Sequence, residues 1–197
     1  MAIGILAFGS LRTNPGSELA PLIDRKDAAE TPFSVEFARS SRKRGGAPTL
    51  VPVEAGLRLP AEILVLNDGI GKHTVIDMLY RRETKQVGTT ARYPSLPQEV
   101  FIKTCHPDAI APDLRDVIFA SNEANIPVEK LTPQYLANLA ISSVAVADPG
   151  WDGITYLIEA KRCSVRTALS EEYESVILAN VGVGSLELAL TVLMAQR

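Results

Sequence analysis

The amino-acid sequence predicts an α+β protein. Short apolar runs bounded by proline or glycine recur over roughly the first 120 residues, whereas helical patterns dominate from Thr132 onward. A group of strands followed by a group of helices favours α+β over alternating βαβ units. The 197 residues are 46% hydrophobic and 22% charged, which is typical of a globular chain that buries a core.

The strands are expected where short apolar runs end in turn residues. Six segments fit this description: 3–8, 33–40, 49–53, 57–66, 100–105 and 115–120. A turn of hairpin length, Glu54-Ala55-Gly56, separates the third segment from the fourth. In the second segment, Val35, Phe37 and Arg39 alternate with Ser34, Glu36 and Ala38. This alternation predicts one inward face and one more polar face.

A short helix is expected over residues 73–83, because apolar residues recur at helical spacing. Ile76, Leu79, Tyr80 and Glu83 occupy neighbouring i, i+3, i+4 and i+7 positions, so the carboxylate of Glu83 follows the apolar stripe instead of opposing it. Glu83 is therefore a candidate for a partly desolvated acid.

Four further helices are expected in the second half. Thr132-Pro133 is typical of a helix start, and Asp148-Pro149-Gly150 interrupts the pattern. The expected segments are 134–146, 151–162, 170–179 and 185–196.

Charge and composition argue against several classes of function. The formal net charge is −3, and the basic cluster Arg39–Arg44 contains no aromatic residue for base stacking, so we expect no nucleic-acid partner. No apolar run reaches the roughly 20 residues that span a bilayer, so we expect no membrane segment. With two cysteines outside any CxxC spacing and no secretion signal, the expected location is cytoplasmic.

Metal and nucleophile motifs are also missing from the sequence. His73, Cys105 and His106 lack the spacing of a three- or four-ligand site, so no metal is expected. Cys105 has no protease signature around it, and packing at a strand end is its expected role. Ser10 lacks the second glycine of a GxSxG elbow, which argues against a hydrolase nucleophile.

The turn after the first strand is the first candidate site. Phe8-Gly9-Ser10-Leu11 follows an apolar run, and Gly9 allows a positive φ and close approach of a ligand. The N–H groups of such a turn can converge into a nest that binds a carboxylate or an amide oxygen. A plain chain reversal is the alternative.

The same turn resembles a known family. Phe8-Gly9-Ser10-Leu11 is similar to the Tyr-Gly-Ser-Asn/Leu loop at the end of the first strand in γ-glutamylcyclotransferase-like proteins. Residues 35–37, 44–52 and 59–66 resemble the family's next strands in order and spacing. The resemblance covers roughly residues 3–93.

The family's catalytic glutamate lies in Leu-Asp-x-x-Glu, and Leu79-Tyr80-Arg81-Arg82-Glu83 is similar to that motif. The resemblance implies Glu83 as the catalytic acid and base. Tyr80 stands in place of the aspartate. Asp77, one turn earlier, is the alternative acid, and loss of activity is a third alternative.

The resemblance implies a small mixed β-barrel over residues 1–125, with a helical extension over 126–197 packed on it. It further implies that a γ-glutamyl amine or peptide is cyclised to 5-oxoproline, with Phe8, Gly9, Ser10 and Leu11 binding the glutamyl head and Glu83 moving the proton. No cofactor and no metal are expected, and the partner is the small-molecule substrate.

Several alternatives stay open. One is a non-catalytic small-metabolite binding or scaffolding protein on the same fold. The helical half could form a homodimer interface, a lid or only core. Arg12 and residues 39–44 could contact an acidic substrate or be solvated charges.

Overall fold

The computed structural model describes residues 2–105 and 110–197, which form two compact units. The first, here the sheet unit, combines Met1–Pro32 with Arg58–Asn122. The second, here the helical unit, combines Phe33–Leu57 with Glu123–Arg197. Five α-helices and two sheets occur in the described residues, which confirms the α+β class.

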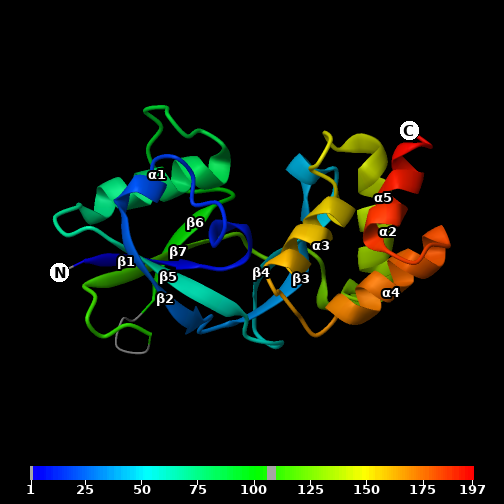
Figure 1. Cartoon of the computed structure of the whole chain (residues 1–197), viewed down its shortest axis with the longest axis horizontal. Helices are drawn as coiled ribbons and strands as arrows, with labels where there is room; N and C mark the ends of the chain where they lie inside the picture. The colour runs from blue at the N-terminus through cyan, green and yellow to red at the C-terminus, as the bar shows by residue number, and fades with distance from the viewer. Residues whose placement is uncertain (1, 106–109) are drawn as a thin grey trace. The chain divides into compact units, whose positions relative to one another are not determined.

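The sheet unit contains a five-stranded sheet in the order β2-β5-β1-β7-β6 (Figure 1). The central strand β1 pairs antiparallel with β5 and parallel with β7, whereas β2 and β6 form the edges through antiparallel pairing. The strands are β1 (Ile3–Ala7), β2 (Ile23–Glu30), β5 (Pro60–Leu66), β6 (Phe101–Cys105) and β7 (Asp116–Ser121).

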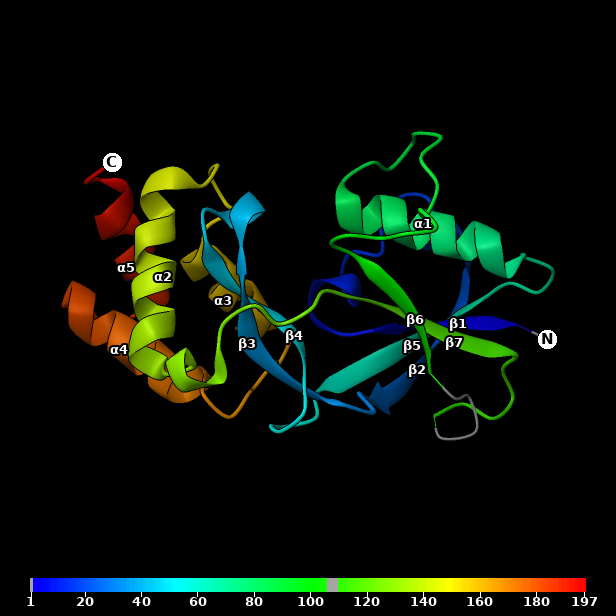
Figure 2. The same ribbon diagram turned by 180° about the vertical axis from the view of Figure 1, so that it is seen from behind.

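Helix α1 (Lys72–Thr84) covers one face of this sheet (Figure 2). Val75 and Leu79 are fully buried in a cluster with Ile5 of β1 and Leu64 of β5. Because side chains alternate along a strand, every second residue of β1 and β5 faces α1. The expected helix at 73–83 is present and extends one residue further at each end.

The helical unit joins a two-stranded sheet to four helices. β4 packs against α2 and α3, and the helices pack on one another. The side-chain oxygens of Thr132 and Ser185 cap α2 and α5, as residues of these types do at helix starts. The elements are β3 (Ser34–Ser41), β4 (Ala47–Val53), α2 (Pro133–Val146), α3 (Gly153–Arg162), α4 (Ser170–Val181) and α5 (Leu186–Met194).

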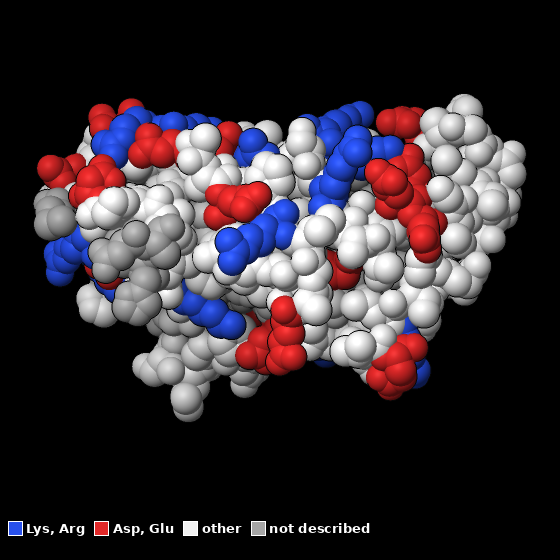
Figure 3. Space-filling view, turned by 90° about the horizontal axis from the view of Figure 1, so that it is seen from below, with Lys and Arg blue, Asp and Glu red and all other residues white. Residues whose placement is uncertain are grey.

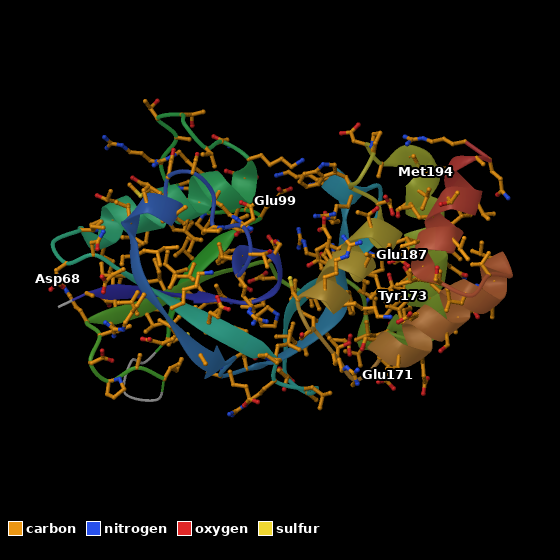
Figure 4. The ribbon with its side chains drawn as sticks, viewed as in Figure 1. Asp68, Glu99, Glu171, Tyr173, Glu187 and Met194 are labelled. Carbon is orange, nitrogen blue, oxygen red and sulfur yellow. The ribbon has the colours of Figure 1, made fainter. Side chains whose placement is uncertain are left out.

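Tyr173 of α4 lies in the core of the helical unit (Figure 4). Its ring is fully buried and packs edge-on against Phe37 of β3, with the ring centres 5.4 Å apart. Burial raises the pKa of the Tyr173 hydroxyl, because the charged form would be desolvated. Glu171, by contrast, is exposed at the start of the same helix.

Three expectations about the strands need correction. The expected closed barrel is wrong for the described strands: β3 and β4 pair with each other, and the five-stranded sheet keeps two edges. Strand β2 was not expected, because Ile23–Glu30 is rich in charge; as an edge strand it tolerates charged residues. The expected polar face of residues 34–39 is interrupted, since Glu36 is buried and the strand pairing shifts after it.

The grouping of residues also differs from the expected division at residue 125. Residues 33–57 form the hairpin that belongs with the C-terminal helices, while residues 58–122 return to the sheet unit. The chain therefore leaves the sheet unit after β2 and re-enters it before β5.

Charged residues of both signs are interspersed over much of the face shown in Figure 3. Within residues 2–105 and 110–197, no single helix has the length and apolar character needed to cross a membrane. Helices α4 and α5, bent by 42° at their break, pass that test of length and composition only as a pair.

Candidate functional site

The turn that follows β1 is a short 3-10 segment, Gly9–Leu11, with Leu11 buried and Ser10 exposed. Gly9 has φ +61°, a conformation that side-chain-bearing residues adopt at a cost. The first N–H groups of a helical turn have no carbonyl partner inside it. The positive φ is the reason that this position requires glycine. The N–H groups at the start of the turn are suited to bind a ligand.

The residues after the turn fold back on it. The backbone N–H of Asn14 donates to the carbonyl of Ser10 at 2.9 Å, and the hydroxyl of Thr13 donates to the same carbonyl at 3.3 Å. The N–H of Arg12 donates to the carbonyl of Gly9. These bonds give residues 9–14, here the β1 loop, a defined shape.

Glu83 lies in the last turn of α1. The helix ends because Lys85 adopts the left-handed conformation, with φ +60°, and the N–H of Gln86 then bonds to the carbonyl of Arg81 at 2.7 Å. The side chain of Glu83 is 25% exposed. Val75 and Leu79 of the same helix are buried against the sheet, and their packing positions the helix that carries Glu83.

Arg82 connects Glu83 to the β1 loop. One terminal nitrogen, Nη1, donates to Oε1 of Glu83 at 2.6 Å, and the other, Nη2, donates to Oγ of Ser10 at 3.2 Å. Nη2 and Nε also donate to the carbonyl of Asn14, at 2.8 and 3.2 Å. The structure therefore brings two of the predicted site residues, Ser10 and Glu83, to opposite sides of one guanidinium.

Arg81 makes a second connection from the same helix. Its guanidinium pairs with Glu18, with Nη2 and Oε2 2.7 Å apart, and donates to the carbonyl of Ala91 at 2.9 Å. Glu18 also accepts a bond from the N–H of Gly88 at 2.6 Å. The hydrogen bond from Arg81, followed by that from Gly88, lowers the pKa of Glu18.

Asp77, the alternative acid, has a different environment. Its Oδ1 accepts a hydrogen bond from the backbone N–H of Tyr93 at 2.8 Å. The hydroxyl of Tyr93 accepts one from the N–H of Ile102 at 3.0 Å, and its ring packs edge-on against Tyr80. Asp77 and Tyr80 thus both bind the segment that follows α1.

Charged residues also lie on the other side of the β1 loop. Nη2 of Arg12 is 3.4 Å from Oε1 of Glu62 on β5, and Nζ of Lys26 on β2 is 3.3 Å from Oε2 of the same carboxylate. Lys26 also donates to the carbonyl of Arg12 at 2.9 Å. Of the suggested substrate contacts, Arg12 therefore belongs to the β1 loop and takes part in this ionic cluster.

The basic cluster at 39–44 belongs to the helical unit. Arg39 donates to the carbonyl of Glu123 at 2.8 Å, and the guanidinium of Arg44 lies between the rings of Trp151 and Tyr156. Desolvation by burial lowers the pKa of Arg44. Two charged residues of this cluster, Arg39 and Arg44, thus have structural contacts within the helical unit.

Sequence reasoning assigned no role to Arg82, Lys26 or Glu62. Glu62 had a readable signal, because it is a charged residue at the start of an apolar strand and shares the sheet face of Leu64. Arg82 had no such signal in the sequence. It is adjacent to Glu83, but adjacent residues on a helix do not normally face each other.

Metal ligands do not cluster in the described part of the chain: no group of three or more His, Cys, Asp or Glu side chains is placed to hold an ion there. His73 is exposed at the start of α1, and His106 lies outside the described residues. Burial raises the pKa of Cys105 to about 11, so its thiol is uncharged at neutral pH.

Comparison of the sequence with models of known protein families finds no family that matches it, and comparison with curated proteins finds no match.

Proposed function

We propose that this protein is a γ-glutamylcyclotransferase-like enzyme that converts a γ-glutamyl amine or peptide into 5-oxoproline and a free amine. The observation that carries the proposal is the shared guanidinium of Arg82, which binds both Ser10 of the β1 loop and the carboxylate of Glu83. A loop suited to an oxygen ligand and a carboxylate suited to proton transfer thereby lie at one place.

The reaction joins two groups of one substrate. The α-amino nitrogen attacks the γ-carbonyl carbon, a new C–N bond closes the five-membered ring, and the bond from that carbon to the leaving nitrogen breaks. Glu83 accepts one proton from the attacking nitrogen and returns it to the leaving nitrogen, so the equation balances with no further reactant.

The β1 loop would hold the glutamyl head. The N–H groups of the Gly9–Leu11 turn are suited to the γ-carbonyl oxygen, on which negative charge develops as the amine attacks. Because nucleophile and electrophile belong to one molecule, holding the substrate folded supplies much of the rate advantage. The expected cytoplasmic location and the absence of a cofactor belong to the same proposal.

A test of this function is incubation of the purified protein with γ-glutamyl amino acids, γ-glutamyl amines and glutathione, followed by mass-spectrometric detection of 5-oxoproline. We expect release of 5-oxoproline from at least one member, and a loss of about 10² to 10⁴-fold in Glu83→Gln. Asp77→Asn is the matched control on the same helix, because an asparagine oxygen can still accept the bond from Tyr93.

Two other outcomes would support different conclusions. Turnover that survives Glu83→Gln and is lost in Asp77→Asn would assign the acid to Asp77. A folded wild-type protein that turns over no member, yet binds one of them by calorimetry, would support the second candidate, a non-catalytic binding protein. The packing of Tyr80 against Tyr93, where the family motif has an aspartate, is the observation that favours this candidate.

A further inference from the structure

The guanidinium of Arg82 binds three acceptors that come from two separate parts of the sheet unit. Ser10 and Asn14 belong to the β1 loop, and Glu83 belongs to α1. A planar guanidinium offers five N–H groups in a rigid fork, so binding at one edge sets the direction of the other. The loop therefore determines where Arg82 presents its remaining terminal nitrogen.

The contact between Arg82 and Glu83 is not a consequence of helix geometry. Consecutive residues on an α-helix point about 100° apart, and stabilising side-chain pairs normally lie three or four positions apart. Arg82 reaches Glu83 while its other nitrogens are bound to Ser10 and Asn14. The position of the Glu83 carboxylate is thus coupled to the β1 loop.

Resting on the proposed function, we propose that Arg82 is a positioning residue, which holds the Glu83 carboxylate in register with the β1 loop for the cyclisation of a γ-glutamyl substrate. It acts through Glu83 and Ser10 and carries no proton in the reaction. Without the Arg82 guanidinium, the β1 loop and α1 stay folded, but the Glu83 carboxylate loses its fixed position relative to the loop. A misplacement of about 1 Å is enough to cost about 10²-fold in rate.

Arg81 supplies a matched control. It is the neighbouring arginine on the same helix, its side chain is similarly buried, and it also joins α1 to the segment after β1 through Glu18. Its side chain binds Glu18 and the carbonyl of Ala91, and neither belongs to the β1 loop or to the catalytic proposal. Arg81→Gln thus removes the same charge and a comparable set of bonds without touching Glu83.

The experiment compares steady-state kinetics of wild type, Arg81→Gln, Arg82→Gln and Arg82→Lys on the substrate that releases most 5-oxoproline. We expect kcat to fall about 10²-fold in Arg82→Gln with a much smaller change in KM, because register matters more to the reacting geometry than to binding. Arg82→Lys recovers part of the loss, since an ammonium keeps the charge but lacks the fork. Arg81→Gln keeps kcat within a few-fold of the wild-type value, although its melting temperature falls.

Chemical rescue separates positioning from a merely structural role. Added millimolar guanidinium should restore part of kcat in Arg82→Ala and should leave Glu83→Gln inactive. Equal losses of kcat in Arg81→Gln and Arg82→Gln, or full kcat in Arg82→Gln, would overturn the positioning role while the cyclisation itself stands. A wild-type protein that forms no 5-oxoproline overturns the proposed function and this role together.

Discussion

The buried carboxylate of Glu36 accepts a hydrogen bond from the backbone N–H of Leu169 at 3.1 Å, across 133 positions of the chain. Its other oxygen accepts a bond from the N–H of Phe37 at 2.8 Å. Leu169 directly precedes α4, so this carboxylate joins β3 to the start of a helix, where a negative charge interacts favourably with the helix dipole.

Glu36→Ala should lower the free energy of unfolding of the helical unit by about 3 kcal/mol, because it leaves the buried N–H of Phe37 and the partly buried N–H of Leu169 without an acceptor. Glu36→Gln keeps one acceptor oxygen and should lose less. Urea titration followed by far-UV circular dichroism measures both. An unchanged midpoint for the alanine variant would show that the two bonds contribute nothing.

Arg44→Ala should destabilise the helical unit by about 2 kcal/mol. The guanidinium carbon lies 4.6 Å from the ring centre of Trp151 and 4.5 Å from that of Tyr156, and desolvated cation–π contacts have this magnitude. Trp151 is the only tryptophan in the chain, so its emission reports the change directly. Arg44→Lys keeps the charge without the stacking plane and should lie in between; equal emission spectra for wild type and Arg44→Ala would contradict the contact.

Gly153→Ala should separate α3 from α2. A Cβ at this position would lie 2.8 Å from the Cα of Ala140, and backbone atoms cannot move aside as a flexible side chain can. We expect a loss of about 1 to 3 kcal/mol in thermal unfolding. Gly184→Ala is the control, since a Cβ there meets no atom within 4 Å, and its unfolding should change by less than about 0.5 kcal/mol. Equal stability of the two variants would show that the approach of the helices at Gly153 is not close.

Glu18→Gln should change the dependence of stability on pH. The pKa of Glu18 is lowered in the folded state, chiefly by its hydrogen bond with Arg81, so its contribution is present above the unfolded value of 4.5 and is lost as the pH falls through the folded value. At pH 7 we expect the variant to be less stable by up to about 1 kcal/mol. Melting temperatures measured from pH 7 down to pH 3 should converge; a constant difference would show that the ionisation of Glu18 does not stabilise the fold.

Local signals in the sequence were sufficient for most elements of the fold. The apolar run that ends at Gly9, the Thr132-Pro133 helix start and the apolar spacing along α1 each act within a few residues. Strand β2 escaped prediction because charged residues are poor strand formers, and only its pairing with β5 makes it a strand. The same limit applies to the barrel, since closure of a sheet depends on which distant strands pair.

The sequence by itself determined the α+β class, most helices and strands, and the glycine that the β1 turn requires, because these depend on local backbone preferences and side-chain periodicity. Only the tertiary structure decided the rest. It placed residues 33–57 with the C-terminal helices, buried Glu36 against Leu169 and set Arg82 between Ser10 and Glu83. Pairing, burial and ionic contacts between residues far apart in the chain depend on which surfaces meet, and no local pattern specifies that.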